Sequence, residues 1–340
     1  MTTPHRLYVG TIGEGLFRSL DGGETFLRAC EGMFVECHVR ALAVDPRDPA
    51  TLYLGSEQGL FVSHDGADSW SQLPAPLAGL QVWSLLLTAE RPGRILAGTC
   101  PARLFRSEDG GKTWTEPAVR MVQDCPRILH TRVTALLGDP ADPEIVWAGV
   151  EIDALYRSRD GGRTWQPAGT GLSSRDIHAL ALVPGRDGRP RRLLAATNND
   201  LNRSTDDGLT WTPLEVGKAL PWSYCRALAQ QCGRPEVVFL GNGDFPPGSA
   251  GVVARSADGG DTWQAAVMPG RANSTIWNFA VHPADPELVY ASSVSGQVYR
   301  STDGGTTWQK LPREFGEVRA LAWAPSPDAP AAGPGHRPMG

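Results

Sequence analysis

One eight-residue pattern, Ser-x-Asp-x-Gly-x-Thr-Trp, recurs along the chain with small variations. Its seven copies occupy residues 19–26, 63–70, 107–114, 158–165, 204–211, 256–263 and 301–308. The Asp residues of successive copies are 44 to 52 positions apart, which is the length of one four-stranded propeller blade. Within each copy the Asp side chain can accept hydrogen bonds from the backbone that follows, and glycine tolerates a positive φ. The pattern therefore predicts a hairpin turn in each of seven structural repeats.

Short runs of alternating apolar residues surround each turn and predict β-strands, named A to D in chain order within a blade. We therefore expect an all-β fold, a single seven-bladed β-propeller of four-stranded blades. Residues 6–28 supply strands B, C and D, whereas residues 317–325 supply only an A strand. Pairing of this C-terminal strand with the N-terminal strands would complete the seventh blade and leave no open sheet edge. The propeller would span residues 1–325, and residues 326–340 would form a disordered tail.

The composition is that of a soluble globular protein, with 41% hydrophobic residues, 20% charged residues and a net charge of −5. Nucleic acid is not an expected partner, because 37 acidic residues outnumber 32 basic ones and no basic run is present. We expect no membrane span, since no apolar run reaches about 18 residues. The N-terminal residues lack a signal-peptide pattern, and the cysteines form no Cys-x-x-Cys pair. These features predict a cytoplasmic protein with reduced thiols, and we expect a monomer.

The repeated pattern resembles the Asp-box, or BNR repeat, of the sialidase-like propeller superfamily. That superfamily includes sialidases, xyloglucan-type glycoside hydrolases, the sortilin ectodomain and Ycf48-like proteins. The resemblance covers about residues 6–325 and is closest in general character to single-propeller, Ycf48-like members. It implies the propeller fold rather than one chemistry, because the Asp-box is a structural turn. The Arg-Ile-Pro motif of sialidases does not occur in the sequence, so no sialidase residue is assigned.

The A strands of a propeller line its central channel, and one aligned position in them carries unusual residues. This position, one residue into each A strand, is occupied by Arg40, Trp83, Thr134, His178, Arg226, Trp277 and Arg319. We call these seven residues the channel ring. Three arginines with two tryptophans are suited to a carboxylate, a phosphate or an acidic peptide, because a guanidinium group can bind two oxygens of an oxyanion. The alternative is that each arginine pairs with a loop carboxylate such as Glu14, Glu57 or Glu317 and fills the channel.

Loop lengths indicate which face of the ring carries function. The two longest insertions, residues 121–130 and 241–251, fall in D–A and B–C connections, which lie on the same face, here called the top face. We expect a ligand- or protein-binding propeller, without catalysis, that uses this face and the channel mouth to hold an anionic group or an acidic peptide. A carbohydrate is the alternative ligand.

The alternative function is that of a glycoside hydrolase or lyase of the sialidase-like propeller type. It requires two carboxylates at a defined separation on the top face. The candidates lie in B–C loops and are Glu151, Asp153, Asp200 and Asp244. We expect no cofactor and no metal. A thiolate and imidazole site is a weaker alternative, with possible ligands Cys37, Cys125, Cys225, His38 and His130.

Overall fold

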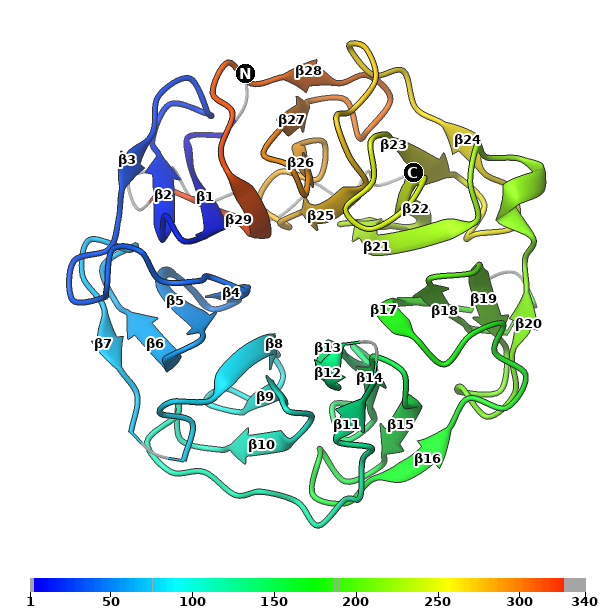
Figure 1. The fold of residues 1–340 in the computed structure, drawn as a ribbon, viewed down its shortest axis with the longest axis horizontal. Helices are drawn as coiled ribbons and strands as arrows, with labels where there is room; N and C mark the ends of the chain where they lie inside the picture. The colour runs from blue at the N-terminus through cyan, green and yellow to red at the C-terminus, as the bar shows by residue number, and fades with distance from the viewer. Residues whose placement is uncertain (1–2, 75, 127, 186–187, 189, 327–340) are drawn as a thin grey trace, which may run out of the picture.

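The computed structural model describes residues 3–74, 76–126, 128–185, 188 and 190–326. In this described part of the chain, seven antiparallel sheets surround a central channel as the blades of a propeller (Figure 1). The predicted all-β, seven-bladed fold is therefore confirmed. The boundaries of the domain remain a prediction, and residues 327–340 of the expected tail lie outside the described residues.

The ring is closed by its terminal strands, as the sequence predicts. Strand β29 (Glu317–Pro325) pairs antiparallel with β1 (His5–Ile12), and β2 (Leu16–Ser19) and β3 (Leu27–Arg28) complete this blade. The pairing extends from His5, opposite Pro325, to Ile12, opposite Glu317. One blade thus contains residues from both ends of the propeller.

The other six blades follow the same A to D order from the channel outward (Figure 1). The A strands are β4 (Ala41–Asp45), β8 (Gln81–Leu87), β13 (Val133–Gly138), β17 (Ile177–Val183), β21 (Tyr224–Gln231) and β25 (Ile276–Ala280). The B strands are β5 (Asp48–Ser56), β9 (Ile95–Cys100), β14 (Val146–Val150), β18 (Arg192–Thr197), β22 (Arg234–Gly243) and β26 (Val289–Ser293). The C strands are β6 (Gly59–Ser63), β10 (Leu104–Ser107), β15 (Ala154–Ser158), β19 (Leu201–Ser204), β23 (Gly251–Ser256) and β27 (Val298–Ser301).

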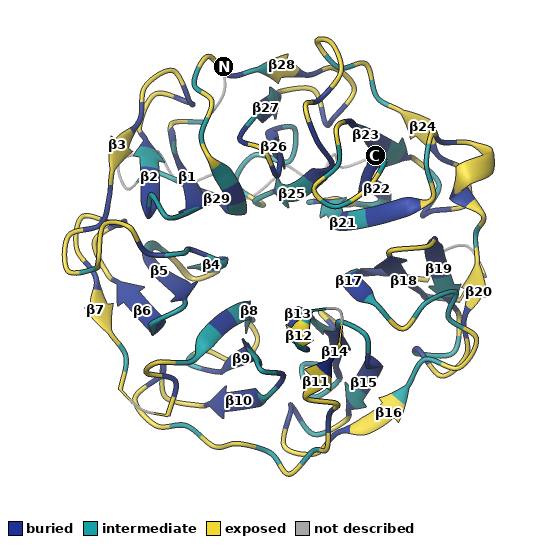
Figure 2. Cartoon of the chain, in the orientation of Figure 1, coloured by how far each residue is buried: buried dark blue, intermediate teal, exposed yellow. Residues whose placement is uncertain are grey.

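The outermost D strands are short and exposed, as Figure 2 shows. They are β7 (Ser71–Gln72), β16 (Gln166–Ala168), β20 (Thr212–Pro213), β24 (Gln264–Ala265) and β28 (Gln309–Lys310). In the blade that begins with β8, the D position is a single bridge between Arg106 and Thr115. Two further features lie in the connections after D strands: a hairpin of β11 (Asp124–Cys125) with β12 (Leu129–His130), and a 3₁₀ helix, η1 (Val216–Lys218).

The repeated pattern forms the C–D turns, and Asp160 illustrates its chemistry. The Asp160 carboxylate accepts hydrogen bonds from the Ser158 hydroxyl, from the Arg163 and Thr164 amides and from the Thr164 hydroxyl. Burial raises the pKa of Asp160, but these donors outweigh it and lower the pKa to about 2. The Asp residues of all seven copies have a lowered pKa. The Asp side chain therefore stabilises its own turn, as predicted.

Adjacent blades approach closely where a B strand carries glycine. A Cβ atom at Gly149 would lie 2.4 Å from the Ile177 side chain of the next A strand. Gly98 is in the same relation to Val133 of the following blade, with a Cβ distance of 2.5 Å. Because Ile177 and Val133 are fully buried, these contacts fix where each A strand begins at the channel.

Candidate functional site

All seven residues of the channel ring line one cavity of about 360 Å³ at the centre of the propeller. The sequence-based alignment of the A strands therefore places them correctly in space. Each A strand contributes three consecutive residues to the lining. The third of these is leucine in six strands and Phe279 in the remaining one. The cavity thus changes from polar to apolar along the direction of the A strands.

A β-bulge explains why large polar side chains occupy the ring positions. In six of the seven A strands, the register between strands A and B skips one residue, and that residue is the ring residue. The exception is Arg40, which directly precedes β4. A bulge leaves its extra residue unpaired and redirects its side chain. The buried residue just before each bulge, for example Ile177 before His178, packs between blades instead.

Four arginines lie over two tryptophans at the channel mouth. The guanidinium carbons of Arg40 and Arg132 lie 4.5 Å and 4.3 Å from the Trp83 ring centre. Those of Arg226 and Arg319 lie 3.8 Å and 4.3 Å from the Trp277 ring centre. Arg132 was not among the sequence-based candidates. It is found by moving two positions back from Thr134, to the next residue that faces the same side of the strand.

The expected ion pairs between channel arginines and loop glutamates form in only one case. Arg319 contacts Glu317 through its Nε atom. Glu57 instead accepts a hydrogen bond from the His38 amide at 2.7 Å. Among the described residues, no carboxylate oxygen lies within ion-pair distance of Arg40 or Arg226. These two arginines are held by aromatic stacking rather than by an acidic partner.

The arginines affect one another electrostatically. Burial and the nearby Arg132 lower the pKa of Arg40. Burial, with the charges of Arg226 and Arg40, lowers the pKa of Arg319 to about 10, although Glu317 opposes this shift. A lowered arginine pKa shows that the protonated form is disfavoured in this environment. Arg40 and Arg226 therefore add positive charge to the channel mouth with no carboxylate at ion-pair distance among the described residues.

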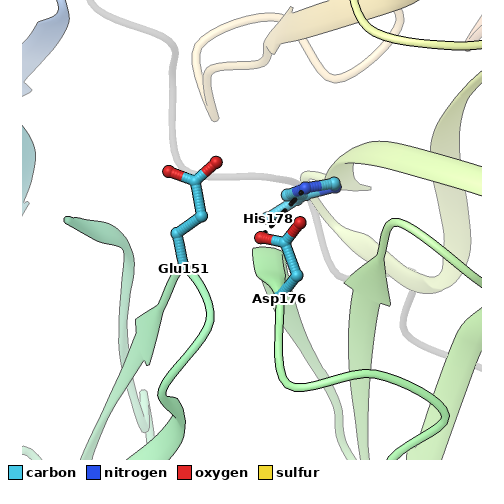
Figure 3. A group of neighbouring side chains, drawn as sticks. All are labelled: Glu151, Asp176 and His178. Carbon is cyan, nitrogen blue, oxygen red and sulfur yellow. Dashed lines mark ion pairs between the residues drawn. The ribbon is translucent and has the colours of Figure 1, made fainter. Parts of the chain in front are cut away.

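A second polar group lies beside the ring and consists of Glu151, Asp176 and His178 (Figure 3). One ligand atom from each residue lies within 4.8 Å of the other two. Asp176 directly precedes β17 and was missed from the sequence, although it stands two positions before the ring residue His178. Burial raises the pKa of Asp176, but His178, Arg226 and Arg132 lower it more, so the net shift is downward.

The other carboxylates proposed for a hydrolase are committed to structural contacts. Asp153 is buried and accepts hydrogen bonds from the Tyr156 hydroxyl and the Val122 amide. Asp200 is buried and accepts hydrogen bonds from the backbone amides of Leu201, Glu215 and Val216. Asp244 binds the Ser249 and Ala250 amides and the Ser249 hydroxyl within its own loop. Glu151 pairs with Arg132, with 2.6 Å between Oε2 and Nε.

The structure does not gather the thiols and imidazoles of the alternative metal set. Among the described residues, the cluster of Glu151, Asp176 and His178 is the only group of three possible metal ligands. Burial raises the pKa of the Cys37 thiol to about 12, as expected of a structural thiol. Cys225 is fully buried, and His130 pairs with Asp124 at 3.1 Å.

A groove of about 500 Å³ adjoins the ring. Trp277 and Arg319 line both this groove and the channel cavity. The remaining wall is mainly apolar and includes Pro246, Pro247 and Phe315. Next to the groove, the Phe245 side chain belongs to the 241–251 insertion and is 67% exposed. The insertion that the sequence marked as functional thus borders the ring.

No helix among the described residues has the length and apolar character needed to cross a membrane.

Comparisons with known proteins agree with this architecture. The model of the BNR/Asp-box repeat family matches residues 156–167 and 299–310. A xyloglucanase from Paenibacillus sp is 28% identical over 190 residues, which are 46% of this chain and 18% of the relative. The chain thus spans less than a fifth of the length of that curated relative.

Two solved structures share the fold. An ancestral GH74 enzyme superposes with a TM-score of 0.62 and 15% identity, over 90% of this chain and 39% of that chain. YCF48 bound to D1 peptide superposes with a TM-score of 0.60 and 20% identity, over 89% of this chain and 88% of that chain. The chain thus carries BNR/Asp-box repeats on a seven-bladed β-propeller, a fold that it shares with both of these structures.

Proposed function

We propose that this protein is a non-catalytic binding propeller that holds an acidic peptide at the mouth of its channel. The observation that supports this most strongly is the set of four arginines stacked on Trp83 and Trp277. Stacking restricts each guanidinium group, and Arg40 and Arg226 have no carboxylate at ion-pair distance among the described residues, which leaves their N–H donors available to a ligand. Such preordered donors suit carboxylates, which accept two parallel hydrogen bonds.

Electrostatics support the same proposal. Arg40 and Arg226 have no carboxylate within ion-pair distance among the described residues, and the pKa of Arg319 is lowered to about 10 by burial and by its cationic neighbours. A bound anion would relieve this repulsion and replace the water lost on burial. An anionic ligand is therefore favoured over a neutral sugar.

The groove favours a peptide over a small anion. It shares Trp277 and Arg319 with the channel cavity, so one ligand can occupy both spaces. An acidic group would contact the arginines, while the neighbouring part of the peptide would lie against Pro246, Pro247 and Phe315. YCF48, which shares the fold, has been solved with a bound peptide, and this shows that such a propeller can accommodate one.

Fluorescence anisotropy with a labelled hexaglutamate peptide tests the proposal. We expect Arg226→Ala to weaken binding about tenfold or more, because a hydrogen bond between charged groups contributes about 1.5–3 kcal/mol. Arg47→Ala is the matched control, since Arg47 is exposed in the A–B turn at the opposite end of a blade from the channel ring and its loss changes the net charge equally. Equal affinities of the two variants, with unchanged melting temperatures, would show that the channel does not hold the anion.

Hydrolysis of a xyloglucan-type carbohydrate is the second candidate function. It is supported by the partial likeness to the Paenibacillus xyloglucanase and by the proximity of Glu151 to Asp176. Against it, each carboxylate already has a cationic or imidazole neighbour, Arg132 for Glu151 and His178 for Asp176. A glycosidase needs one of its two carboxyl groups protonated as a general acid, whereas the pKa of Asp176 is lowered, because His178, Arg226 and Arg132 outweigh the effect of burial. Release of reducing ends from xyloglucan, lost in Glu151→Gln, would establish the hydrolase instead.

A further inference from the structure

The cluster of Glu151, Asp176 and His178 is partly shielded from solvent and has no role in the proposed peptide binding. The side chain of His178 is 2% exposed, that of Asp176 16% and that of Glu151 12%. Glu151 follows β14, whereas Asp176 and His178 flank the first residue of β17 in the next blade. Figure 3 shows the two carboxylates and the imidazole grouped at this junction.

Contacts of the imidazole determine which nitrogen faces the carboxylates. His178 Nδ1 lies 2.7 Å from the Cys225 carbonyl oxygen. A carbonyl only accepts hydrogen bonds, so Nδ1 carries the proton and donates. Nε2 is therefore the nitrogen that faces Asp176 Oδ1, and it can bind a metal ion when it carries no proton. Metal-bound histidines are commonly oriented in this way, by donation from the second nitrogen to a backbone carbonyl.

The spacing of one pair of these groups, His178 and Asp176, matches that of two ligands around one cation. His178 Nε2 and Asp176 Oδ1 are 3.4 Å apart, which is longer than the usual upper limit of about 3.2 Å for an N–H···O hydrogen bond. Two ligands bound tetrahedrally at about 2.1 Å from a zinc ion are separated by about 3.4 Å. Asp176 Oδ1 is also buried without a hydrogen-bond donor in the described part of the chain.

We propose that Glu151, Asp176 and His178 bind one divalent transition-metal ion of the zinc type. An imidazole with two carboxylates suits such an ion better than magnesium or calcium, which prefer oxygen ligands alone. Because His178 also lines the channel cavity, the remaining coordination position would face that cavity. None of the three ring arginines is a ligand of this site, although Arg132 contacts Glu151.

Arg132 is compatible with the metal site. It lies 2.6 Å from Glu151 Oε2, but a carboxylate has about four acceptor positions on its two oxygens. Carboxylate ligands of metals are usually hydrogen-bonded to a second protein group. Arg132, itself stacked on Trp83, would orient Glu151 towards the ion. The two negative charges of the ligands would match the charge of a divalent cation.

Titration of metal-free, reduced protein with Co²⁺, an optical substitute for Zn²⁺, tests the site. We expect one equivalent to bind with the visible absorption of a four-coordinate nitrogen and oxygen site. Asp176→Asn, Glu151→Gln and His178→Gln should each weaken binding about tenfold or more. Glu57→Gln is the control, because Glu57 is a top-face carboxylate outside the cluster. A competition titration then gives the Zn²⁺ affinity of each protein.

Several outcomes would overturn the metal site. These are no bound Co²⁺, equal binding by the wild type and Asp176→Asn, or a thiolate-to-cobalt absorption band that identifies cysteine ligands. Melting curves show whether each variant is folded, and Asp176→Asn preserves side-chain shape if His178→Gln does not fold. Hexaglutamate binding is measured separately after chelation of metal. Loss of metal binding with retained peptide binding, or the reverse, therefore separates this proposal from the proposed function.

Discussion

The guanidinium carbon of Arg226 lies 3.8 Å from the centre of the Trp277 ring, within the range of a strong cation–π contact. The same ring carries Arg319 at 4.3 Å, so one tryptophan orders two cationic groups from adjacent positions around the channel. Trp277 thus offsets part of the repulsion between them. The predictions about binding follow from this arrangement.

Replacement of Trp277 by leucine should weaken hexaglutamate binding, because Arg226 and Arg319 lose the surface that orders them. We expect a decrease of about threefold to thirtyfold, corresponding to about 0.5–2 kcal/mol of cation–π energy. Fluorescence anisotropy measures it. Trp222→Leu is the control, since Trp222 contacts Arg271 and does not line the channel cavity. Equal affinities in both variants would contradict the role of Trp277.

Phosphate should stabilise the protein more than chloride at equal ionic strength, because it can bind between the channel arginines. Binding to the native state raises the melting temperature, and calorimetry detects the shift. In Arg40→Ala with Arg226→Ala, the specific part of this increase should disappear. The general stabilising effect of phosphate as an excluded salt remains in both proteins and serves as the reference. An undiminished shift in the double variant would exclude these arginines as the anion site.

Removal of the exposed Phe245 side chain distinguishes the contribution of the groove to binding from that of the ring arginines. Because Phe245 is 67% exposed, Phe245→Ser should not destabilise the fold. We expect it to weaken binding of a peptide with an apolar segment before an acidic C-terminus, measured by calorimetry, and to leave the phosphate-induced shift unchanged. A loss of both responses would show that the loop acts on the arginines and not on the groove.

Stability should decrease in acid because of the Asp-box turns. The pKa of Asp160 is about 2 in the folded protein, below its unfolded value of about 3.9, so the unfolded state binds more protons in this range. The carboxylate therefore contributes stability above about pH 4, and this is lost as the pH falls towards 2. Asp160→Asn should cost about 1 kcal/mol at pH 7. Its melting temperature should also vary less between pH 4 and pH 2 than that of the wild type.

Enlargement of Gly149 should displace the start of β17. A Cβ at this position would lie 2.4 Å from the Ile177 side chain, so Gly149→Ala is expected to cost about 1–3 kcal/mol through overpacking. Denaturant unfolding measures this cost. Gly217→Ala is the control, because the nearest atom to its added Cβ is 3.6 Å away. Equal stability of both variants would mean that the blades can move apart without penalty.

The sequence predicted the fold because its decisive features are local and repeated. Each Asp-box is a turn whose hydrogen bonds are internal, and the seven copies set the register of the A strands well enough to find the channel ring. The cluster around Asp176 was missed because it depends on the distance between blades, and no short-range pattern joins Glu151 to Asp176. Asp153 and Asp200 resemble loop carboxylates in sequence, yet their donors come from residues that only folding brings near.

The bulges at the ring positions also could not be predicted. A strand read from alternation alone has no skipped residue, whereas the structure shifts register at Trp83, Thr134, His178, Arg226, Trp277 and Arg319. The alignment nevertheless identified residues that line the channel cavity, because every such A strand contains its bulge at the same place. Because the bulge occurs at the equivalent position in these six A strands, the strands stay aligned with one another in sequence.

The pairing of β29 with β1 has a consequence for biosynthesis. Strands β1 to β3 are synthesised before residues 317–325, and their sheet is complete only when those residues join it. Domains usually fold as units, and here the last native contact of the unit involves a strand about 300 residues later in synthesis than its partner. Until then β1 presents an unpaired edge, so the incomplete propeller is exposed to misassembly at this edge.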